Sequence, residues 1–225
     1  MEKNKKNKQE KIIFQGFDRG VEYKSMKEKL IKEYDIQKIN LDALDNNSAS
    51  YVSQKRILNY KLIYLLISMI QLRNGSRISE AVDAFRQFID ENDFKTKVIV
   101  KIAKSESIKY KKGTGEKFLT KIRYRKIKYP DTWVSYDDFS DYISDFDSRI
   151  KYLPNKRIQK RVLDYLLKYF YCNTHSLRYA FINYLLYDQK RPMTDVAKFV
   201  GHSNINQLVT YTQLKNTDQI FDLDI

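Results

Sequence analysis

The last quarter of the chain holds side chains suited to breaking and rejoining a phosphodiester bond. His175 and Arg178 are three residues apart, His202 follows a glycine, and Tyr211 comes nine residues later. Arginine can donate two parallel N–H bonds to a phosphate, histidine can hold or transfer a proton, and tyrosine can act as a nucleophile. Because residues three apart share one face of a helix, His175 and Arg178 can reach the same ligand. This set could cut a DNA strand and hold the broken end as a phosphotyrosine.

A second arginine lies far upstream, in the run Asn-Gly-Ser-Arg77-Ile-Ser-Glu80. The Asn74-Gly75 pair is typical of the end of a helix, since glycine readily adopts the backbone of a helix C-cap. An amphipathic pattern follows directly, with apolar residues at helical spacing over residues 78–89. The sequence therefore predicts that Arg77 and Glu80 lie in the first turn of a helix.

Each of these residues also has a purely structural interpretation. The chain has 18 tyrosines, and most tyrosines serve in packing. A phenol with an unperturbed pKa of about 10 is also a poor nucleophile at neutral pH unless it is assisted. Cys172, His175 and His202 could be proposed as metal ligands, but their spacing matches no zinc framework and Cys172 is the only cysteine. We therefore expect no metal ion.

The charge of the chain indicates a polyanionic partner. The formal net charge is +14 and the pI is about 9.5. Residues 95–129 contain 13 lysines and arginines, opposed only by Glu106 and Glu116. A two-stranded ribbon of this charge suits a DNA groove and its phosphates; the alternative is a solvent-exposed strand edge protected by lysines. The predicted DNA-binding residues are Lys101, Lys109, Lys111, Lys112, Lys117, Lys121, Arg123, Arg125 and Lys126.

The elements that must position these residues are mainly helical. We expect a basic arm at residues 1–11, a short helix from the capping box Ser25–Glu28 to about Tyr34, and a linker over residues 39–53. Alternation of apolar and polar residues predicts strands over residues 97–103 and 118–129. Helical spacing predicts helices over residues 55–72, 78–89, 156–171, 175–187, 194–200 and 204–214, and one more that begins at Ser135. The expected fold class is mainly α with a small antiparallel β-sheet or hairpin.

The expected location follows from what the chain lacks. Its most apolar run, residues 62–72, is too short for a membrane-spanning helix, which needs about 20 apolar residues, and it predicts a buried core helix. The lysine-rich N-terminus has no apolar signal-peptide core, and the single Cys172 excludes an internal disulfide. We therefore expect a cytoplasmic, DNA-associated protein of the cell interior, with no membrane partner.

In order and spacing, these motifs resemble those of the tyrosine recombinases, also called phage-type integrases. The run that contains Arg77 resembles the family box T-G-x-R-x-S-E, and His175-Ser-Leu-Arg178 resembles H-x-L-R. Gly201-His202-Ser203 and Tyr211-Thr212 resemble G-H-S…Y-T, with the family's ten-residue step from glycine to tyrosine. The resemblance covers residues 53–215, and the archaeal virus integrases are among the proteins that the chain resembles.

The resemblance implies a role for each residue. Arg77 and Arg178 would bind the scissile phosphate and stabilise the charge that develops on it in the transition state. Tyr211 would attack the phosphorus, leaving a 3′-phosphotyrosyl link and a free 5′-hydroxyl. His175 would accept a proton or bind the phosphate, and His202 would donate to a phosphate oxygen.

The family's general acid is a lysine on a β-hairpin. Lys104, at the end of the first predicted strand, fits that place best, and Lys101 is the alternative. Glu80 would orient its neighbours. Covalent catalysis conserves the phosphodiester energy in the tyrosyl link, so no ATP, metal or other cofactor is implied.

The resemblance also implies domains and partners. Residues 53–215 would form the catalytic domain, residues 1–52 a basic arm with a short helix and a linker, and residues 216–225 a tail exchanged between protomers. The partner would be double-stranded DNA, on which the protein would assemble as a homotetramer. Two departures are that family members usually carry a DNA-binding domain of about a hundred residues before the catalytic one, and that Tyr179 follows Arg178 where a basic residue is common.

Three functions are compatible with these patterns. The first is a site-specific recombinase or integrase, which we favour because the ordered motifs carry a mechanism and not only a composition. The second is a type IB topoisomerase-like nicking-closing enzyme of the same fold. The third is a non-catalytic DNA-binding protein, against which the complete set of histidines, arginines and tyrosine argues. A defined DNA site and tetramer formation would separate the first function from the second.

Overall fold

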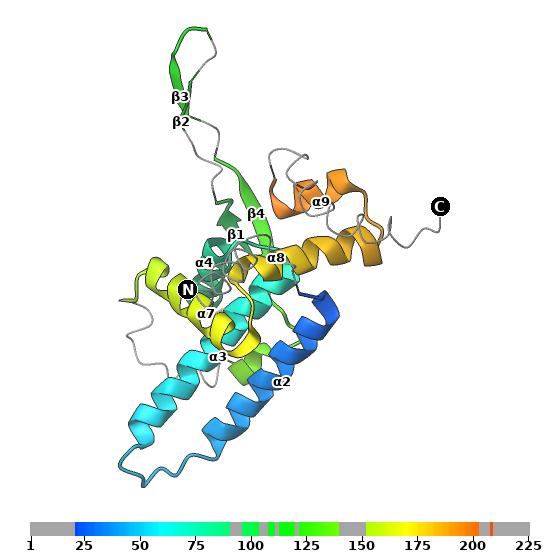
Figure 1. Ribbon diagram of the computed structural model, residues 1–225. Helices are drawn as coiled ribbons and strands as arrows, with labels where there is room; N and C mark the ends of the chain where they lie inside the picture. Colours follow the sequence, from blue (N-terminus) through cyan, green and yellow to red (C-terminus); the bar gives the residue numbers. More distant parts are fainter. Residues whose placement is uncertain are drawn as a thin grey trace, which may run out of the picture.

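A helical body carries a narrow β-ribbon that extends away from it (Figure 1). The computed structural model describes residues 21–90, 96–103, 108–110, 113–119, 122–139, 152–202 and 208. The expected fold class, mainly α with a small antiparallel sheet, is confirmed. Within these ranges, no helix combines the length and the apolar character that a membrane span requires.

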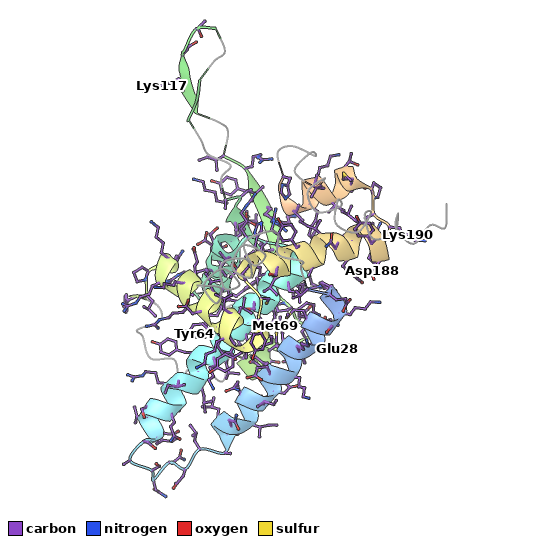
Figure 2. The ribbon with its side chains drawn as sticks, in the orientation of Figure 1. Glu28, Tyr64, Met69, Lys117, Asp188 and Lys190 are labelled. Carbon is purple, nitrogen blue, oxygen red and sulfur yellow. The ribbon has the colours of Figure 1, made fainter. Side chains whose placement is uncertain are left out.

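Helix α3 (Tyr51–Asn74) is the central element of the body. Helix α2 (Tyr23–Asp42) runs back along it to form a helical hairpin (Figure 1). Helices α4 (Ile78–Asp90), α7 (Asn155–Phe170) and α8 (Thr174–Asn183) also pack against α3. Nearly every side chain of residues 62–72 is buried, including Met69, which Figure 2 labels. This confirms the predicted core helix and makes α3 the scaffold for the elements around it.

Helix α2 differs from the short helix expected in its place. Its N-cap is Glu22, whose carboxylate accepts the backbone N–H groups of Lys24 and Ser25, so the predicted capping box at Ser25 was wrong. The helix also continues past Tyr34 to Asp42, because its apolar positions keep helical spacing and pack into the same core as α3. The linker between the two helices is therefore limited to residues 43–50.

The ribbon consists of two short antiparallel pairs. Strand β1 (Lys97–Lys101) pairs with β4 (Tyr124–Lys128), and β2 (Ile108–Tyr110) pairs with β3 (Lys117–Leu119). The predicted strand over residues 97–103 is confirmed for residues 97–101, whereas the one predicted over 118–129 is divided between β3 and β4. The pair β2–β3 lies away from the body, as the position of Lys117 in Figure 2 shows.

The helices at the C-terminal side agree with the sequence pattern. Helices α7, α8 and α9 (Met193–Val200) confirm those predicted over residues 156–171, 175–187 and 194–200. The second ends as a π-helical turn, η1 (Tyr184–Asp188). The basic arm over 1–11, the tail and the helix predicted over 204–214, Leu208 apart, lie outside the described residues, as does most of the helix predicted from Ser135.

Candidate active site

The side chain of Asn74 binds the end of α3 to strand β4. The Asn74 amide nitrogen donates to the Lys128 carbonyl (2.8 Å), and its amide oxygen accepts the Lys128 backbone N–H (2.9 Å). Gly75 then caps the helix with φ 55°, the left-handed backbone that glycine adopts without strain. A Cβ at Gly75 would lie 2.4 Å from Cδ1 of Phe181, so the close approach of α8 also requires glycine. These contacts fix the turn that leads to Arg77.

The same turn is joined to the start of α8 by Gln71. Its amide nitrogen donates to the Ser76 carbonyl (3.1 Å) and to the Thr174 carbonyl (2.7 Å). Thr174 is the first residue of α8, which also carries His175 and Arg178. One buried amide thus connects the two segments that hold the predicted arginines, although about a hundred residues separate them in the chain.

Glu80 is fully buried and accepts hydrogen bonds from three segments. Its carboxylate accepts the backbone N–H of Arg77 (3.2 Å) and Nη1 of the same arginine (3.1 Å). It also accepts the backbone N–H of Ala103 (3.0 Å) and Nη1 of Arg125 (3.4 Å). Glu80 therefore orients Arg77, whose side chain keeps 21% of its surface exposed.

Arg178 is buried in the centre of this arrangement. Its Nη1 donates to the Gly75 carbonyl, and its Nη2 donates to the Val200 carbonyl (3.0 Å). Asn173 begins α8 with a capping box, accepting the backbone N–H of Ser176. His175 is exposed and meets the Tyr179 ring edge-on at 4.8 Å. The spacing of His175 and Arg178 predicted that both could reach one ligand, but in the structure His175 is exposed and Arg178 is buried.

His202 follows the end of α9. Gly201 caps that helix with φ 75°, and the His202 backbone N–H donates to the Ala197 carbonyl (2.9 Å). A Cβ at Gly201 would lie 3.0 Å from Cδ1 of Ile102, so the turn before His202 packs on the residue that follows strand β1. Because the Val200 carbonyl accepts a hydrogen bond from Arg178, this turn lies next to the Arg178 guanidinium.

Arg125 differs from the exposed groove-binding residue that the sequence predicted. It lies on the inward face of β4, with 8% of its surface exposed, and donates to Glu80 and to the carbonyls of Asn74 and Val200. Burial lowers its pKa to about 10; Glu80 opposes this effect, and the positive charges of Arg178 and Arg77 add to it. The alternation that buries Ile127 two residues later could have revealed this, since side chains two apart share a strand face.

The outer face of the β1–β4 pair carries the exposed cations. Lys97, Lys101 and Lys126 are exposed there, and Ile99 and Tyr124 stand between them with 59% and 62% of their surfaces exposed. Such alternation of cations with apolar and aromatic side chains suits a surface that contacts phosphates and sugars.

The remaining predicted residues have mixed placements. Lys117 is exposed, Arg123 is half-buried, and Lys109 lies in the short strand β2. Outside the described residues are Lys104, Lys111, Lys112, Lys121 and Tyr211.

Chemically, the arginine cluster is suited to an anion. Arg77 and Arg125 bind the single carboxylate of Glu80, and Arg178 lies near enough to Arg125 to lower its pKa, so the cluster of three guanidinium groups keeps net positive charge. In the part of the chain that the structure describes, no three histidine, cysteine or acidic side chains come together in a metal-binding group. A cavity of about 580 Å³ lies elsewhere, between the first half of α3 and the start of α7, and none of its lining residues belongs to the predicted site.

Comparisons with other proteins identify relatives along most of the chain. No protein-family model matches. The chain is 44% identical over 213 residues to "Putative integrase V10" of Sputnik virophage, an alignment that covers 95% of this chain and 92% of that protein. It is 32% identical over 219 residues to an uncharacterized protein of Methanocaldococcus jannaschii, covering 92% and 90%. It is 31% identical over 155 residues to "Putative integrase ORF241" of Acidianus two-tailed virus, covering 68% and 52%.

A similar chain is also found among solved structures. The pre-cleavage complex of the XerH site-specific recombinase bound to difH substrate contains a chain that is 16% identical, with a TM-score of 0.42. The match covers 85% of this chain and 52% of that one. This chain therefore spans about half the length of that recombinase and of the Acidianus virus relative.

Proposed function

Because the chain belongs to the integrase family of tyrosine recombinases, of the kind found in viruses, we propose that it cleaves and rejoins DNA strands through a 3′-phosphotyrosyl intermediate. The observation that carries the proposal is the contact between the turn before Arg77 and the helix that carries Arg178. These residues come from motifs about a hundred positions apart, yet Gly75 and Gln71 join the turn before Arg77 directly to helix α8. Two arginines in one site are suited to the two non-bridging oxygens of a phosphodiester.

The proposed reaction is a phosphoryl transfer to tyrosine. The Tyr211 oxygen attacks the phosphorus, the new O–P bond forms, and the bond from phosphorus to the 5′ oxygen breaks. His175 receives the tyrosine proton, and Lys104 gives a proton to the leaving 5′ oxygen. Arg77, Arg178 and His202 stabilise the negative charge on the phosphate oxygens in the transition state. Reversal of these steps with a 5′-hydroxyl from another strand rejoins the DNA, so no energy source is consumed.

The ribbon supports the choice of double-stranded DNA as substrate. Its outer face presents Lys97, Lys101 and Lys126 on the β1–β4 strand pair, which is joined to the body through Asn74 and Glu80. A two-stranded ribbon fits a DNA groove, and lysines there neutralise phosphates. In this proposal the ribbon holds the duplex while Arg77 and Arg178 bind one scissile phosphate.

A tetramer on DNA is part of the proposal, with the tail over residues 216–225 docked on a neighbouring protomer. That tail interleaves three acidic residues with four large apolar ones, in an otherwise basic chain. Truncation after Lys215 should reduce higher-order complexes on a target duplex while nicking by monomers persists. Sedimentation of the truncated protein with DNA tests this, and an undiminished complex would exclude docking by the tail.

The function is tested with a suicide substrate, a duplex nicked next to the cleavage site so that the cut end diffuses away. The full chain should form a covalent adduct that survives denaturation, and Tyr211→Phe should form none while its DNA affinity stays within a few-fold. An adduct from the Phe variant would move the nucleophile to another tyrosine. Tyr179 and Tyr187 would be the next candidates. The absence of any adduct from the unaltered chain would exclude the proposed chemistry.

A further inference from the structure

A buried arginine of strand β4 has no role in the chemistry described above. The inward positions around Arg125 are apolar: Val98 and Val100 on β1, and Ile127 on β4, are all buried. A charged side chain among them carries a desolvation cost that an aliphatic residue would avoid. Such a residue is expected only where its contacts compensate that cost, so its partners indicate what it does.

The partners of Arg125 come from three separate segments. Its Nη2 donates to the Asn74 carbonyl (2.6 Å) at the end of α3, and its Nη1 lies 3.4 Å from the Glu80 carboxylate on α4. The same Nη1 donates to the Val200 carbonyl (3.3 Å) at the end of α9. The guanidinium also lies over the Phe199 ring, 5.4 Å from its centre. Arg125 thus forms hydrogen bonds both to the segments around Arg77 and to the end of α9.

Each of these partners leads to a residue of the proposed reaction. Asn74 precedes the turn to Arg77, and Glu80 binds Arg77 directly. Val200 is followed by Gly201 and His202, and its carbonyl also accepts Nη2 of Arg178. Without Arg125, Glu80 would still bind Arg77. Of the two arginines described as binding the Val200 carbonyl, only Arg178 would remain. Arg178 would then have to bind both the Val200 carbonyl and the scissile phosphate.

We propose that Arg125 is a positioning residue that holds the end of α9 at the phosphate site, so that His202 and Arg178 stay aligned on the scissile phosphate. This inference rests on the proposed function. A guanidinium is required, because its planar fork reaches acceptors on several sides at once, whereas a lysine ammonium is a single point of charge. The position of Arg125 on the ribbon also makes the DNA-contacting element itself part of the site's support.

The test measures single-turnover cleavage at saturating DNA together with the thermal unfolding midpoint. Arg125→Met and Arg125→Lys should each slow cleavage by at least about tenfold, and by up to about 10²-fold, the loss expected from misplacing reacting groups by about 1 Å. The DNA dissociation constant should change less than threefold, because the side chain faces inward. Cleavage by either variant at the unaltered rate would overturn the proposal, and Arg125→Lys keeps the charge in case the Met variant does not fold.

Arg86→Met is the matched control for a merely structural arginine. Arg86 is a part-buried arginine of α4 that donates to Asn155 and to the Leu153 carbonyl, at the start of α7 and outside the site. Its loss should lower the unfolding midpoint without changing the cleavage rate of the folded protein. If Arg125→Met behaved like Arg86→Met, Arg125 would be structural and the inference would be wrong.

A double-mutant cycle with His202 separates positioning from an independent effect. If Arg125 acts by placing the turn that holds His202, the pair Arg125→Met and His202→Ala should lose much less than the product of the two single losses. Full multiplication of the losses would overturn the proposal. An adduct from the unaltered chain with no effect at Arg125 would refute this inference alone, whereas failure of the unaltered chain would refute the proposed function.

Discussion

Glu80 accepts the backbone N–H of Ala103 at 3.0 Å, and this hydrogen bond joins the first turn of α4 to the segment that follows strand β1. The same carboxylate holds Arg77, so the arginine of the first motif and the end of β1 share one buried anchor. Ala103 is the residue directly before Lys104. Lys104 lies outside the described residues, and in the proposed reaction it is the proton donor to the leaving oxygen.

Lys104→Ala should slow cleavage of an ordinary duplex by about 10²-fold or more, the usual contribution of a general acid. It should slow cleavage of a duplex with a 5′-bridging phosphorothiolate much less, because a thiolate leaves without a proton. Lys101→Ala, three residues earlier on the outer face of β1, is the comparison. An equal loss on both substrates would remove Lys104 from this role, and a substrate-dependent loss in Lys101→Ala would transfer the role to Lys101.

The sequence predicted the local part of the site well. The order of Gly75, Arg77 and Glu80 around a helix start follows from neighbours in the chain, and the structure places them in that way. The burial of Arg178 was not predictable in the same way, because it depends on carbonyls 103 and 22 residues away. Spacing placed His175 and Arg178 on one face, but only long-range packing decides which of the two is exposed.

Arg125 was assigned to DNA for a related reason. A count of positive charges treats every cation of the ribbon alike, whereas the strand places successive side chains on opposite faces. Lys126 therefore faces solvent and Arg125 faces α9, although they are neighbours. The extent of α2 was missed because Glu22, and not a serine, caps it, and because the burial of Leu41 depends on packing within the core.

Arg77 and Arg178 should differ in how their loss affects the fold. Alanine at either position should reduce cleavage by about 10²-fold or more, the scale expected for loss of one transition-state donor, and lysine should restore little. Arg178→Ala should also lower the unfolding midpoint, because the Gly75 carbonyl loses its Arg178 donor and the Val200 carbonyl keeps only Arg125. Arg77→Ala should lower it less, since that side chain is partly exposed. Near-complete rescue by lysine at both positions would refute bidentate binding of the phosphate.

The outer face of the ribbon should set the salt dependence of DNA binding. Each phosphate that a lysine neutralises steepens the slope of log K against log salt by about 0.9. Changing Lys97, Lys101 and Lys126 together to glutamine should therefore flatten that slope, with the cleavage products unchanged in position.

The matched control for the ribbon changes Lys24, Lys29 and Lys32 of α2, which are also exposed, to glutamine. It removes the same net charge from a helix on the body and should leave the slope close to that of the unaltered protein. Equal flattening by both triple variants would mean that only net charge matters and that the ribbon does not contact DNA.

Gly75→Ala should destabilise the protein and impair cleavage together. Its backbone has φ 55°, and a left-handed conformation costs a residue with a Cβ about 1–2 kcal/mol. The new methyl group would also lie 2.4 Å from the Phe181 ring. That ring is buried, and its centre lies 6.0 Å from the ring centre of Tyr23 and 5.7 Å from that of Phe199, so little space exists for it to move. Overpacking of this kind adds about 1–3 kcal/mol.

Gly115→Ala separates strain from collision. Gly115 has a similar φ of 65°, but nothing lies within 4 Å of the place its Cβ would take. Chemical denaturation should therefore show a larger loss of unfolding free energy for Gly75→Ala than for Gly115→Ala. Cleavage at saturating DNA should fall only for Gly75→Ala, because its carbonyl binds Arg178 and its backbone leads to Arg77. Equal losses of stability for the two variants would show that the ring moves aside and that the approach of α8 does not depend on glycine.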